Sequence, residues 1–558
     1  MNKRKLCHLL SIGLLAACPV TAQEYISKVW VADQGDGTYK NPILYADYSD
    51  PDVCRVGEDY YLTSSSFNCI PGLQILHSKD LVNWTIIGAA IPHTLQPANL
   101  PEHPEHGNRV WAPSIRHHNG WFYIFWGDPD QGAFMTKAQR PEGPWTEPIL
   151  VKKGKGIIDT TPLWDEDGRV YMVHAYAGSR AGLKSVIAIC ELNSEATQAL
   201  GPSRIVFDGH EKHQTCEGPK FYKKDGYYYL FFPAGGVPTG WQVVARSKHV
   251  YGPYEDRIVM AQGKSPVNGP HQGAWVNTTT GEDWFLHFQD VGAYGRLVHL
   301  QPMKWINGWP VIGNDPDGDG CGEPVLTNKK PNVGQTYPIC TPQEDDEFDS
   351  LVLQPQWQWH ANFNEKWIYP NAKEGFIRLY SYPVSNDCKN LWDVTNLLLQ
   401  KTPAPNFTAT LKLSFSPTQK YIGERTGLVV MGRDYAGLIL RNTTDGIVLE
   451  QIECIKADKG KPETIQASEK LEKRTVYLKA HFSTDFQTIQ ESEGGTDLIV
   501  TCQFSYSLNG KRFKTLGKPF QVREGKWIGA KIGTFCTRPA IVSNDGGWAD
   551  IDWFHIDK

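Results

Sequence analysis

The sequence predicts an all-β chain in which a five-bladed β-propeller is followed by a jelly-roll-like β-sandwich. Five times between residues 50 and 285, a short strand, a turn containing Gly or an acid, and an aromatic strand follow one another. The starts of these units lie 48 to 61 residues apart, which is a spacing typical of propeller blades. After residue 345, apolar and polar residues alternate in several segments with no long amphipathic helix between them, which indicates two packed sheets.

The first 22 residues have the three parts of an export signal. A basic start at residues 3–5 precedes an apolar run, residues 6–15, that is too short to span a membrane, and Ala22 ends a small-residue cleavage pattern. We expect cleavage after Ala22 and a periplasmic protein. Residues 15–18 also fit a bacterial lipobox, in which a lipidated Cys18 would tether the protein to the outer membrane, and secretion is a further alternative.

The rest of the chain is expected to divide into a propeller over residues 23–335 and a sandwich over residues 345–558. The sequence has 56 basic and 61 acidic residues and a formal net charge of −5, so its charge gives no reason to expect nucleic acid or an anionic membrane surface as a partner. No transmembrane segment is predicted. The 12 cysteines form no C-x-x-C pair and no cluster with histidine in the sequence, so their spacing predicts neither a zinc site nor a disulfide pairing.

Each propeller unit opens on a head residue, and the five heads are Asp50, Trp111, Asp159, Glu217 and His271. The innermost strand of each blade runs along the central channel, so the heads are expected to meet at one end of it. Three carboxylates, an indole and an imidazole in one cavity are a composition typical of catalytic sites. Taken singly, each acid has a plainer interpretation, because Asp-Pro and Glu-Gly-Pro are common openings of loops.

The turns that join the first two strands of the units are expected at residues 56–59, 119–120, 167–168, 225–226 and 281–282. A loop rich in Gly, Asp and Pro, residues 313–324, closes the repeats. In it, Asp315, Asp317 and Asp319 have the spacing of the first ligands of an EF-hand, but the twelfth position is Leu326 rather than Glu. We therefore interpret this loop as a solvated turn.

Short alternating segments predict the strands of the sandwich, at residues 407–415, 427–431, 437–440, 476–482 and 549–556. Asn509-Gly510 stands between two further alternating runs and is typical of a tight hairpin turn.

The ordered motifs of the propeller resemble those of glycoside hydrolase family 43, which contains β-xylosidases, α-L-arabinofuranosidases and arabinanases. The matching segments are residues 41–44 with 49–53, Trp111-Ala112-Pro113, the Asp159 head and Glu217-Gly218-Pro219. The C-terminal region is similar to the concanavalin-like domain appended to many xylosidase-type members. Each motif alone is common, whereas the ordered set is specific.

The resemblance implies an inverting hydrolase, with Asp50 as general base, Glu217 as general acid and Asp159 as the carboxylate that tunes and orients the acid. Inversion needs base and acid about 6.5 to 9.5 Å apart, on opposite faces of the sugar. Many members have a smaller residue where this chain has Asp52, so the sequence leaves open which of Asp50 and Asp52 is the base.

The resemblance also implies a set of substrate-binding residues. Trp111 is expected to stack on the sugar and Phe67 to wall the pocket, and Arg296 resembles an arginine near the modulating carboxylate and the sugar hydroxyls. His271 resembles a channel histidine that in relatives binds calcium directly or through water, and the alternative is a hydrogen-bonded histidine without metal.

No cofactor is expected to be required, and a structural calcium is the one candidate ion. Asp346 and Asp552 flank the sandwich in sequence and are further candidate calcium ligands by resemblance, with plain solvation as the alternative.

The resulting hypothesis is an exported, inverting, exo-acting glycoside hydrolase that removes non-reducing terminal α-L-arabinofuranosyl or β-D-xylosyl units from plant hemicellulose oligosaccharides, with a slight preference for the arabinofuranoside. The alternatives are a non-catalytic glycan-binding propeller and an endo-acting arabinanase.

Overall fold

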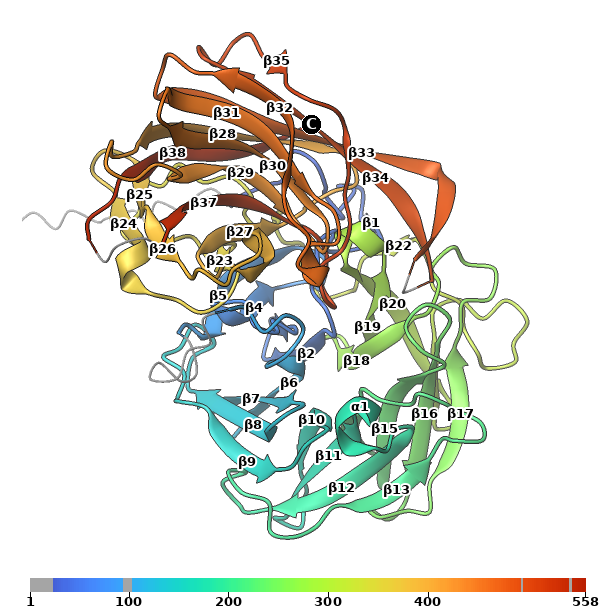
Figure 1. Cartoon of the computed structure of the whole chain (residues 1–558). Coiled ribbons are helices and arrows are strands. Elements are labelled where there is room, and N and C mark those ends of the chain that lie inside the picture. Colours follow the sequence, from blue (N-terminus) through green and yellow to red (C-terminus); the bar gives the residue numbers. More distant parts are fainter. Residues whose placement is uncertain (1–23, 94–102, 493–494, 541–543) are drawn as a thin grey trace, which may run out of the picture.

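The computed structural model describes residues 24–93, 103–492, 495–540 and 544–558. The predicted leader, residues 1–22 with Cys18, lies outside these described residues. Five four-stranded antiparallel sheets form a ring, and two larger sheets stack on each other beside it (Figure 1). The predicted fold class, a five-bladed propeller followed by a sandwich, is confirmed.

Each blade contains four strands in sequence order, of which the first is innermost. The strands of the five blades are, for blade 1, β2 (Asp52–Val56), β3 (Asp59–Thr63), β4 (Gly72–Ser78) and β5 (Trp84–Ile91); for blade 2, β6 (Trp111–His118), β7 (Trp121–Asp128), β8 (Gly132–Ala138) and β9 (Ile149–Lys153); for blade 3, β10 (Ile157–Trp164), β11 (Val170–Tyr176), β12 (Val186–Leu192) and β13 (Arg204–Asp208); for blade 4, β14 (Lys220–Lys224), β15 (Tyr227–Ala234), β16 (Trp241–Ser247) and β17 (Glu255–Met260); for blade 5, β18 (His271–Asn277), β19 (Asp283–Asp290), β20 (Arg296–Ile306) and β21 (Trp309–Ile312).

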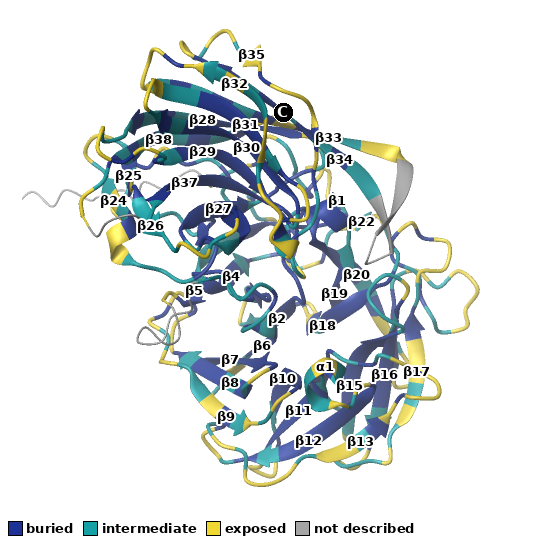
Figure 2. Cartoon of the chain, viewed as in Figure 1, coloured by how far each residue is buried: buried dark blue, intermediate teal, exposed yellow. Residues whose placement is uncertain are grey.

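The five predicted turns join the first two strands of their blades. The second strands are rich in aromatic residues, which suit a pleated and buried surface. The second and third strands of the blades are mostly buried, whereas exposed residues are frequent in the outermost strands β9, β13 and β17 (Figure 2). In blade 5 the outermost strand, β21, is buried as well.

The chain entering the propeller closes the ring onto blade 5. Ile43 donates its backbone N–H to the carbonyl of Val298 in β20 at 2.8 Å, and β1 (Thr38–Lys40) pairs with β22 (Thr327–Lys329) beyond the last blade. The segment before the first head residue thus joins the first and last blades.

The sandwich consists of two eight-stranded sheets. The first contains β23 (Gln358–Trp359), β27 (Leu397–Lys401), β37 (Lys531–Pro539), β29 (Arg425–Met431), β30 (Tyr435–Thr443), β31 (Gly446–Cys454) and β32 (Thr464–Lys470), with β26 (Tyr382–Val384) beside β37. The second contains β24 (Ile368–Asn371), β25 (Phe376–Tyr380), β38 (Trp548–Asp557), β28 (Phe407–Ser416), β33 (Thr475–Ser492), β34 (Gly495–Ser507) and β35 (Lys514–Thr515), with β36 (Phe520–Gln521) beside β34. Every predicted sandwich strand is present, and apolar side chains from both sheets form one core between them.

The helices in the described part of the chain are short, namely α1 (Gly178–Ala181), η2 (Gly292–Tyr294), η3 (Glu365–Trp367), η4 (Leu391–Asp393) and η5 (Ala457–Lys459). None of them has the length and apolar character that crossing a bilayer requires.

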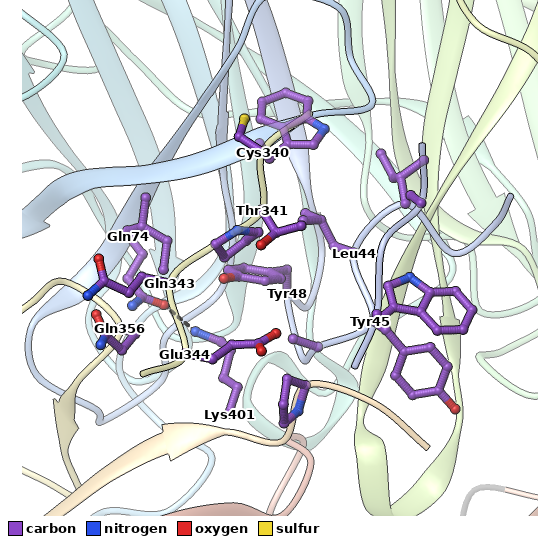
Figure 3. A pocket seen from close by; sticks show the side chains of 18 of the residues that line it. Leu44, Tyr45, Tyr48, Gln74, Cys340, Thr341, Gln343, Glu344, Gln356 and Lys401 are labelled. Atoms are coloured by element: carbon purple, nitrogen blue, oxygen red, sulfur yellow. Dashed lines mark hydrogen bonds between the residues drawn. The ribbon is translucent and has the colours of Figure 1, made fainter. Parts of the chain in front are cut away.

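The sandwich packs directly on blade 1. Trp359 forms a backbone bridge with Ile70, and Gln74 donates its side-chain amide to the carbonyl of Pro355 at 2.7 Å. A cavity of about 50 Å³ remains at this junction, and the side chains of Glu344 and Lys401 are among those that line it (Figure 3). The junction therefore buries two ionisable groups as well as apolar surface.

Candidate active site

The entrance to the innermost strand has the same backbone conformation in all five blades. One residue there has a positive φ in each blade, namely Asp50 (54°), Ala112 (33°), Asp159 (59°), Gly218 (60°) and Gln272 (34°). In blades 2, 3 and 5 the same place is a β-bulge, where the register shifts between the first two strands. Bulges re-aim side chains and are common beside active sites.

This shared conformation shows that the five heads occupy two adjacent positions. Asp50 and Asp159 are themselves the residues with positive φ, whereas Trp111, Glu217 and His271 each stand one residue earlier. Successive side chains of an extended chain point to opposite sides. The general-base and general-acid candidates therefore leave the backbone from different positions, which the sequence spacing alone does not show.

Asp50 is held on both carboxylate oxygens. Ser65 donates its hydroxyl to Oδ2 at 2.5 Å, and Arg296 donates Nη1 to Oδ1 at 3.0 Å. Ser65 in turn accepts the backbone N–H of Ala112 at 2.7 Å, which ties the site to blade 2. With 4 % of its surface exposed, Asp50 is fixed in position by a hydroxyl, a guanidinium and two blades.

Asp159 and Glu217 lie side by side across blades 3 and 4. Asp159 Oδ2 accepts the backbone N–H of Gly218, the residue after Glu217, at 2.7 Å. Burial, followed by the negative charges of Glu217 and Asp50, raises the pKa of Asp159 well above its usual value, although the Gly218 N–H opposes this. Asp159 and Glu217 therefore lie close enough for their charges to interact, which suits a carboxylate that tunes and orients a neighbouring acid.

Glu217 is the carboxylate of the three that reaches solvent. Its side chain is 34 % exposed, and its Oε1 lies 3.0 Å from Nε2 of His271. Arg296 is close enough for its own pKa to be raised by both Asp50 and Glu217, after a larger opposing effect of burial. These residues converge on one place, as predicted.

Asp52 contacts other residues than the head residues do. Its Oδ2 accepts the backbone N–H of Ile115 at 2.6 Å and pairs with Nη1 of Arg116 at 2.5 Å, and Nζ of Lys220 lies 3.9 Å from Oδ1. Asp52 is fully buried between these two cations. This surrounding fits a structural ion pair between blades, so the geometry favours Asp50 over Asp52 as the base.

The aromatic residues predicted around the site lie at the mouth of the same channel end. The rings of Phe67 and Trp111 are 6.5 Å apart and meet edge to face, and Trp111 donates its indole N–H to the carbonyl of Gly107 at 2.8 Å. Phe67 is 4 % exposed, so it supports Trp111 and offers little surface of its own.

The sandwich contributes a residue that the sequence analysis did not find. Trp527 lies in the loop before β37, is 46 % exposed, and its ring centre is 5.8 Å from the guanidinium of Arg296. Its carbonyl accepts the hydroxyl of Ser49 at 3.4 Å, and a Cβ on Gly107 would come within 2.8 Å of its ring. No sequence signal connects this loop with heads more than 250 residues earlier.

The calcium ion expected at His271 stays a prediction. Its Nε2 faces Glu217, and in the described part of the chain it belongs to no cluster of three metal-binding side chains. Calcium takes six to eight oxygen ligands, so water would have to supply most of them here. Asp346 accepts the indole N–H of Trp357 at 2.8 Å and Asp552 lies 3.5 Å from Lys412, so their role as calcium ligands stays a prediction.

The sequence model of glycosyl hydrolases family 43 matches residues 39–310, and that of the β-xylosidase C-terminal concanavalin A-like domain matches residues 345–557. The chain belongs to glycosyl hydrolases family 43. It is therefore a glycosidase, as the sequence predicts.

Relatives agree with this assignment over most of the chain. A putative β-xylosidase of Xylanibacter ruminicola is 37 % identical over 92 % of this chain and 89 % of its own. The non-reducing end α-L-arabinofuranosidase BoGH43B of Bacteroides ovatus is 31 % identical over 73 % of this chain and 76 % of its own. The crystal structure of the family 43 protein BlXynB of Bacillus licheniformis, 28 % identical, superposes with a TM-score of 0.77 over 93 % of this chain and 99 % of its own.

Proposed function

We propose that this family 43 chain removes terminal β-D-xylosyl units from the non-reducing ends of plant hemicellulose oligosaccharides, with inversion of configuration. The observation that carries the proposal is the arrangement of Asp50 and Glu217, which come from different blades and are both within electrostatic reach of Asp159 and Arg296. Non-catalytic glycan binding would not need a carboxylate held on both oxygens in the same place as a second carboxylate that reaches solvent.

In the proposed reaction, Asp50 takes a proton from a water molecule as the water oxygen attacks the anomeric carbon. The bond from that carbon to the glycosidic oxygen breaks at the same time, and Glu217 gives its proton to the leaving oxygen. One sugar of inverted configuration and one alcohol result. Proton exchange with solvent then restores the carboxylate of Asp50 and the acid form of Glu217.

The neighbouring residues position these two groups. Ser65 and Arg296 hold the two oxygens of Asp50, and His271 holds one oxygen of Glu217. Positioning of this kind is a large part of catalysis, because it removes the entropy cost of bringing the reacting groups together.

The choice of β-D-xylose over α-L-arabinofuranose rests on the relative that is named a putative β-xylosidase and matches most of both chains. The arabinofuranoside, which the sequence alone slightly favoured, is the second candidate, since BoGH43B carries that name. Exo action is supported by the sandwich loop with Trp527, which lies against one side of the heads. An endo-acting arabinanase would instead need a groove open on both sides.

The substrate test compares 4-nitrophenyl β-D-xylopyranoside with 4-nitrophenyl α-L-arabinofuranoside, followed by xylo-oligosaccharides labelled at the reducing end. We expect a higher kcat/KM on the xyloside and stepwise loss of single xylose units from the unlabelled end. Internal cleavage, or turnover of neither substrate, would contradict the proposal.

Export also remains a proposal, supported by the composition of residues 1–22. The intact mass of the protein purified from its natural host separates cleavage before Gln23 from lipidation at Cys18. A mass that retains residues 1–22 without lipid would contradict both.

A further inference from the structure

A histidine, an aspartate and a cysteine meet where the propeller and the sandwich touch, away from the channel. His103 lies in the connection between blades 1 and 2, and Asp387 and Cys388 lie in the sandwich before η4. His103 is more than 280 residues from Asp387 and Cys388 in the sequence. The spacing of the cysteines therefore predicted no such cluster. The described residues contain two groups of three side chains that could hold a metal ion. The group at His103 has nitrogen and sulfur donors, whereas the other group has carboxylates alone.

The distances on the Nδ1 side of this cluster are those of ligands on one metal ion. An imidazole nitrogen, a carboxylate oxygen and the thiol sulfur all lie within 4.8 Å of one another. Cys388 Sγ is 3.6 Å from Nδ1 of His103, and the Asp393 carbonyl oxygen is 3.1 Å from that nitrogen and 3.5 Å from that sulfur. Ligands held about 2.0 to 2.3 Å from a tetrahedral zinc ion stand roughly 3.3 to 3.7 Å apart.

The groups that face the imidazole are suited to a cation. Nε2 lies 2.9 Å from a carboxylate oxygen of Asp387, and Nδ1 faces the Asp393 carbonyl and the thiol. The two nitrogens of an imidazole point to opposite sides of the ring, so the Asp393 carbonyl and the thiol share the space at Nδ1 while Asp387 lies at Nε2. A cation at Nδ1 would contact the nitrogen, the carbonyl oxygen and the sulfur, and Asp387 would accept the Nε2–H and orient the ring.

The sandwich side of the cluster is held in shape before any ion binds. Asn390 caps η4 by accepting the N–H of Trp392 at 2.8 Å, and its amide donates to the carbonyls of Ala457 and Lys461. Ser385 donates its hydroxyl to Asp387. A turn fixed by a buried asparagine and a hydroxyl presents its ligands with little left to order, which favours metal binding.

The propeller side is held through the neighbour of His103. The ring of His106 stacks on Trp392 with 3.6 Å between ring centres, and its Nε2 lies 2.8 Å from the Trp392 carbonyl. The segment carrying both histidines is therefore already docked on η4.

We propose that Nδ1 of His103, the thiolate of Cys388 and the Asp393 carbonyl bind one zinc ion, with a water in the fourth position and with Asp387 orienting the imidazole through Nε2. Mixed nitrogen, sulfur and oxygen donors in a tetrahedral set suit zinc and exclude calcium and magnesium, which prefer oxygen alone. Binding forms Zn–N, Zn–O and Zn–S bonds and releases the thiol proton of Cys388 to solvent. The bound thiolate and the nearby carboxylate of Asp387 then balance the two charges of the ion.

An ion at this place would fasten the connection between blades 1 and 2 to the sandwich. The described part of that connection leads from His103 to Gly107, whose carbonyl accepts the indole N–H of Trp111. Zinc would thus fix the segment that supports one wall of the active site, from a position outside it. The site is a positioning device, and its existence does not depend on which sugar the enzyme cleaves.

The test uses the full chain, reduced and freed of metal, titrated with Zn²⁺ against a chromogenic chelator, and with Co²⁺ as a spectroscopic probe. We expect one zinc per chain, a raised unfolding temperature with zinc, and a thiolate-to-cobalt charge-transfer band. Cys388→Ser is expected to remove the band and weaken zinc binding about 100-fold or more, and His103→Ala to weaken it as strongly. Asp387→Asn is expected to weaken it by about 10- to 100-fold.

Cys321→Ser and Asp317→Asn are matched controls, because they change a thiol and a carboxylate at the other metal-like group, the exposed Asp315–Asp317–Asp319 loop. Both controls are expected to retain the zinc and the cobalt band. All variants should unfold at the wild-type temperature without metal, which shows that a lost ion is not a lost fold. The absence of saturable zinc binding, unchanged binding in Cys388→Ser, or loss of binding in a control would overturn the proposal.

Discussion

Buried ionisable groups in the channel and at the domain junction differ in whether they have an ionic partner. In the channel, Asp50 faces Arg296 at 3.0 Å and Asp52 faces Arg116 at 2.5 Å. At the junction, Glu344 and Lys401 line one cavity (Figure 3), yet in the described part of the chain neither is placed in an ion pair. An ionic partner offsets part of the cost of burying a charge, whereas a buried charge without an ionic partner is driven toward its neutral form.

The pKa values at the junction follow from this difference. Burial, opposed by the hydroxyl of Ser27, raises the pKa of Glu344 to about 8. Burial and the positive charge of Lys531 lower the pKa of Lys401 to about 7. We therefore expect the carboxylates of the channel to determine turnover, and Glu344 and Lys401 at the junction to determine how stability depends on pH.

The largest expected effect is on turnover in Glu217→Gln. The amide keeps the shape and the contact with His271 but cannot give a proton to the leaving oxygen, so kcat on xylo-oligosaccharides should fall by about 10²- to 10⁴-fold. The loss should be much smaller on aryl xylosides with good leaving groups, which need little protonation. Steady-state kinetics on both substrate types measures it.

Glu344→Gln is the matched control for this variant, because it makes the same chemical change at the junction. It should leave kcat within about twofold of wild type. A Glu217→Gln enzyme that loses the same factor on every leaving group would contradict the role of Glu217 as acid.

The second effect is on stability against pH. The pKa of Glu344 in the folded protein is higher than its unfolded value of 4.5. Between about pH 4.5 and 8 the folded state therefore binds more protons than the unfolded state, so stability should fall as the pH rises through this range. The pKa of Lys401 in the folded protein is lower than its unfolded value of 10.5. Burying the charged ammonium therefore costs its full stability penalty below about pH 7, and this penalty should disappear as the pH rises toward 10.5. Stability should be lowest between these windows, near pH 7 to 8.

Two variants at the junction isolate these windows. The stability advantage of Glu344→Gln over wild type should grow by on the order of 2 to 4 kcal/mol as the pH rises from 5 to 8, and Lys401→Met should lose the rise in stability above pH 7. Urea unfolding at a series of pH values measures both. Glu58→Gln, an exposed change, should follow the wild-type curve, and equal slopes in all four proteins would refute the explanation.

The smallest effect is expected at Trp527, where the two regions meet. Trp527→Ala removes an exposed ring near Arg296, and we expect KM to rise by about 3- to 10-fold with little change in kcat, because stacking on a sugar is lost while the carboxylates stay in place. Phe486→Ala changes another exposed aromatic of the sandwich and should leave KM unchanged. A fall in kcat of more than tenfold in Trp527→Ala would show that the loop does more than bind sugar.

The sequence predicted the ring because each blade repeats local signals, such as the glycine turn between the first two strands. It also predicted the convergence of Asp50, Asp159 and Glu217, since strand order fixes where heads meet. It did not predict the one-residue offset of Glu217, because a positive φ at Gly218 is a backbone property. Distant partners such as Trp527 depend on how two domains dock, which no local pattern encodes.

The most direct test of the central claim is the configuration of the sugar at the moment of release. Proton NMR of xylo-oligosaccharide hydrolysis, recorded before mutarotation, follows the anomeric proton of the free xylose. If Asp50 activates water on one face while Glu217 protonates the leaving oxygen on the other, α-xylose should appear first from the β-linked substrate. First appearance of β-xylose would mean retention of configuration and would contradict the assignment of both residues.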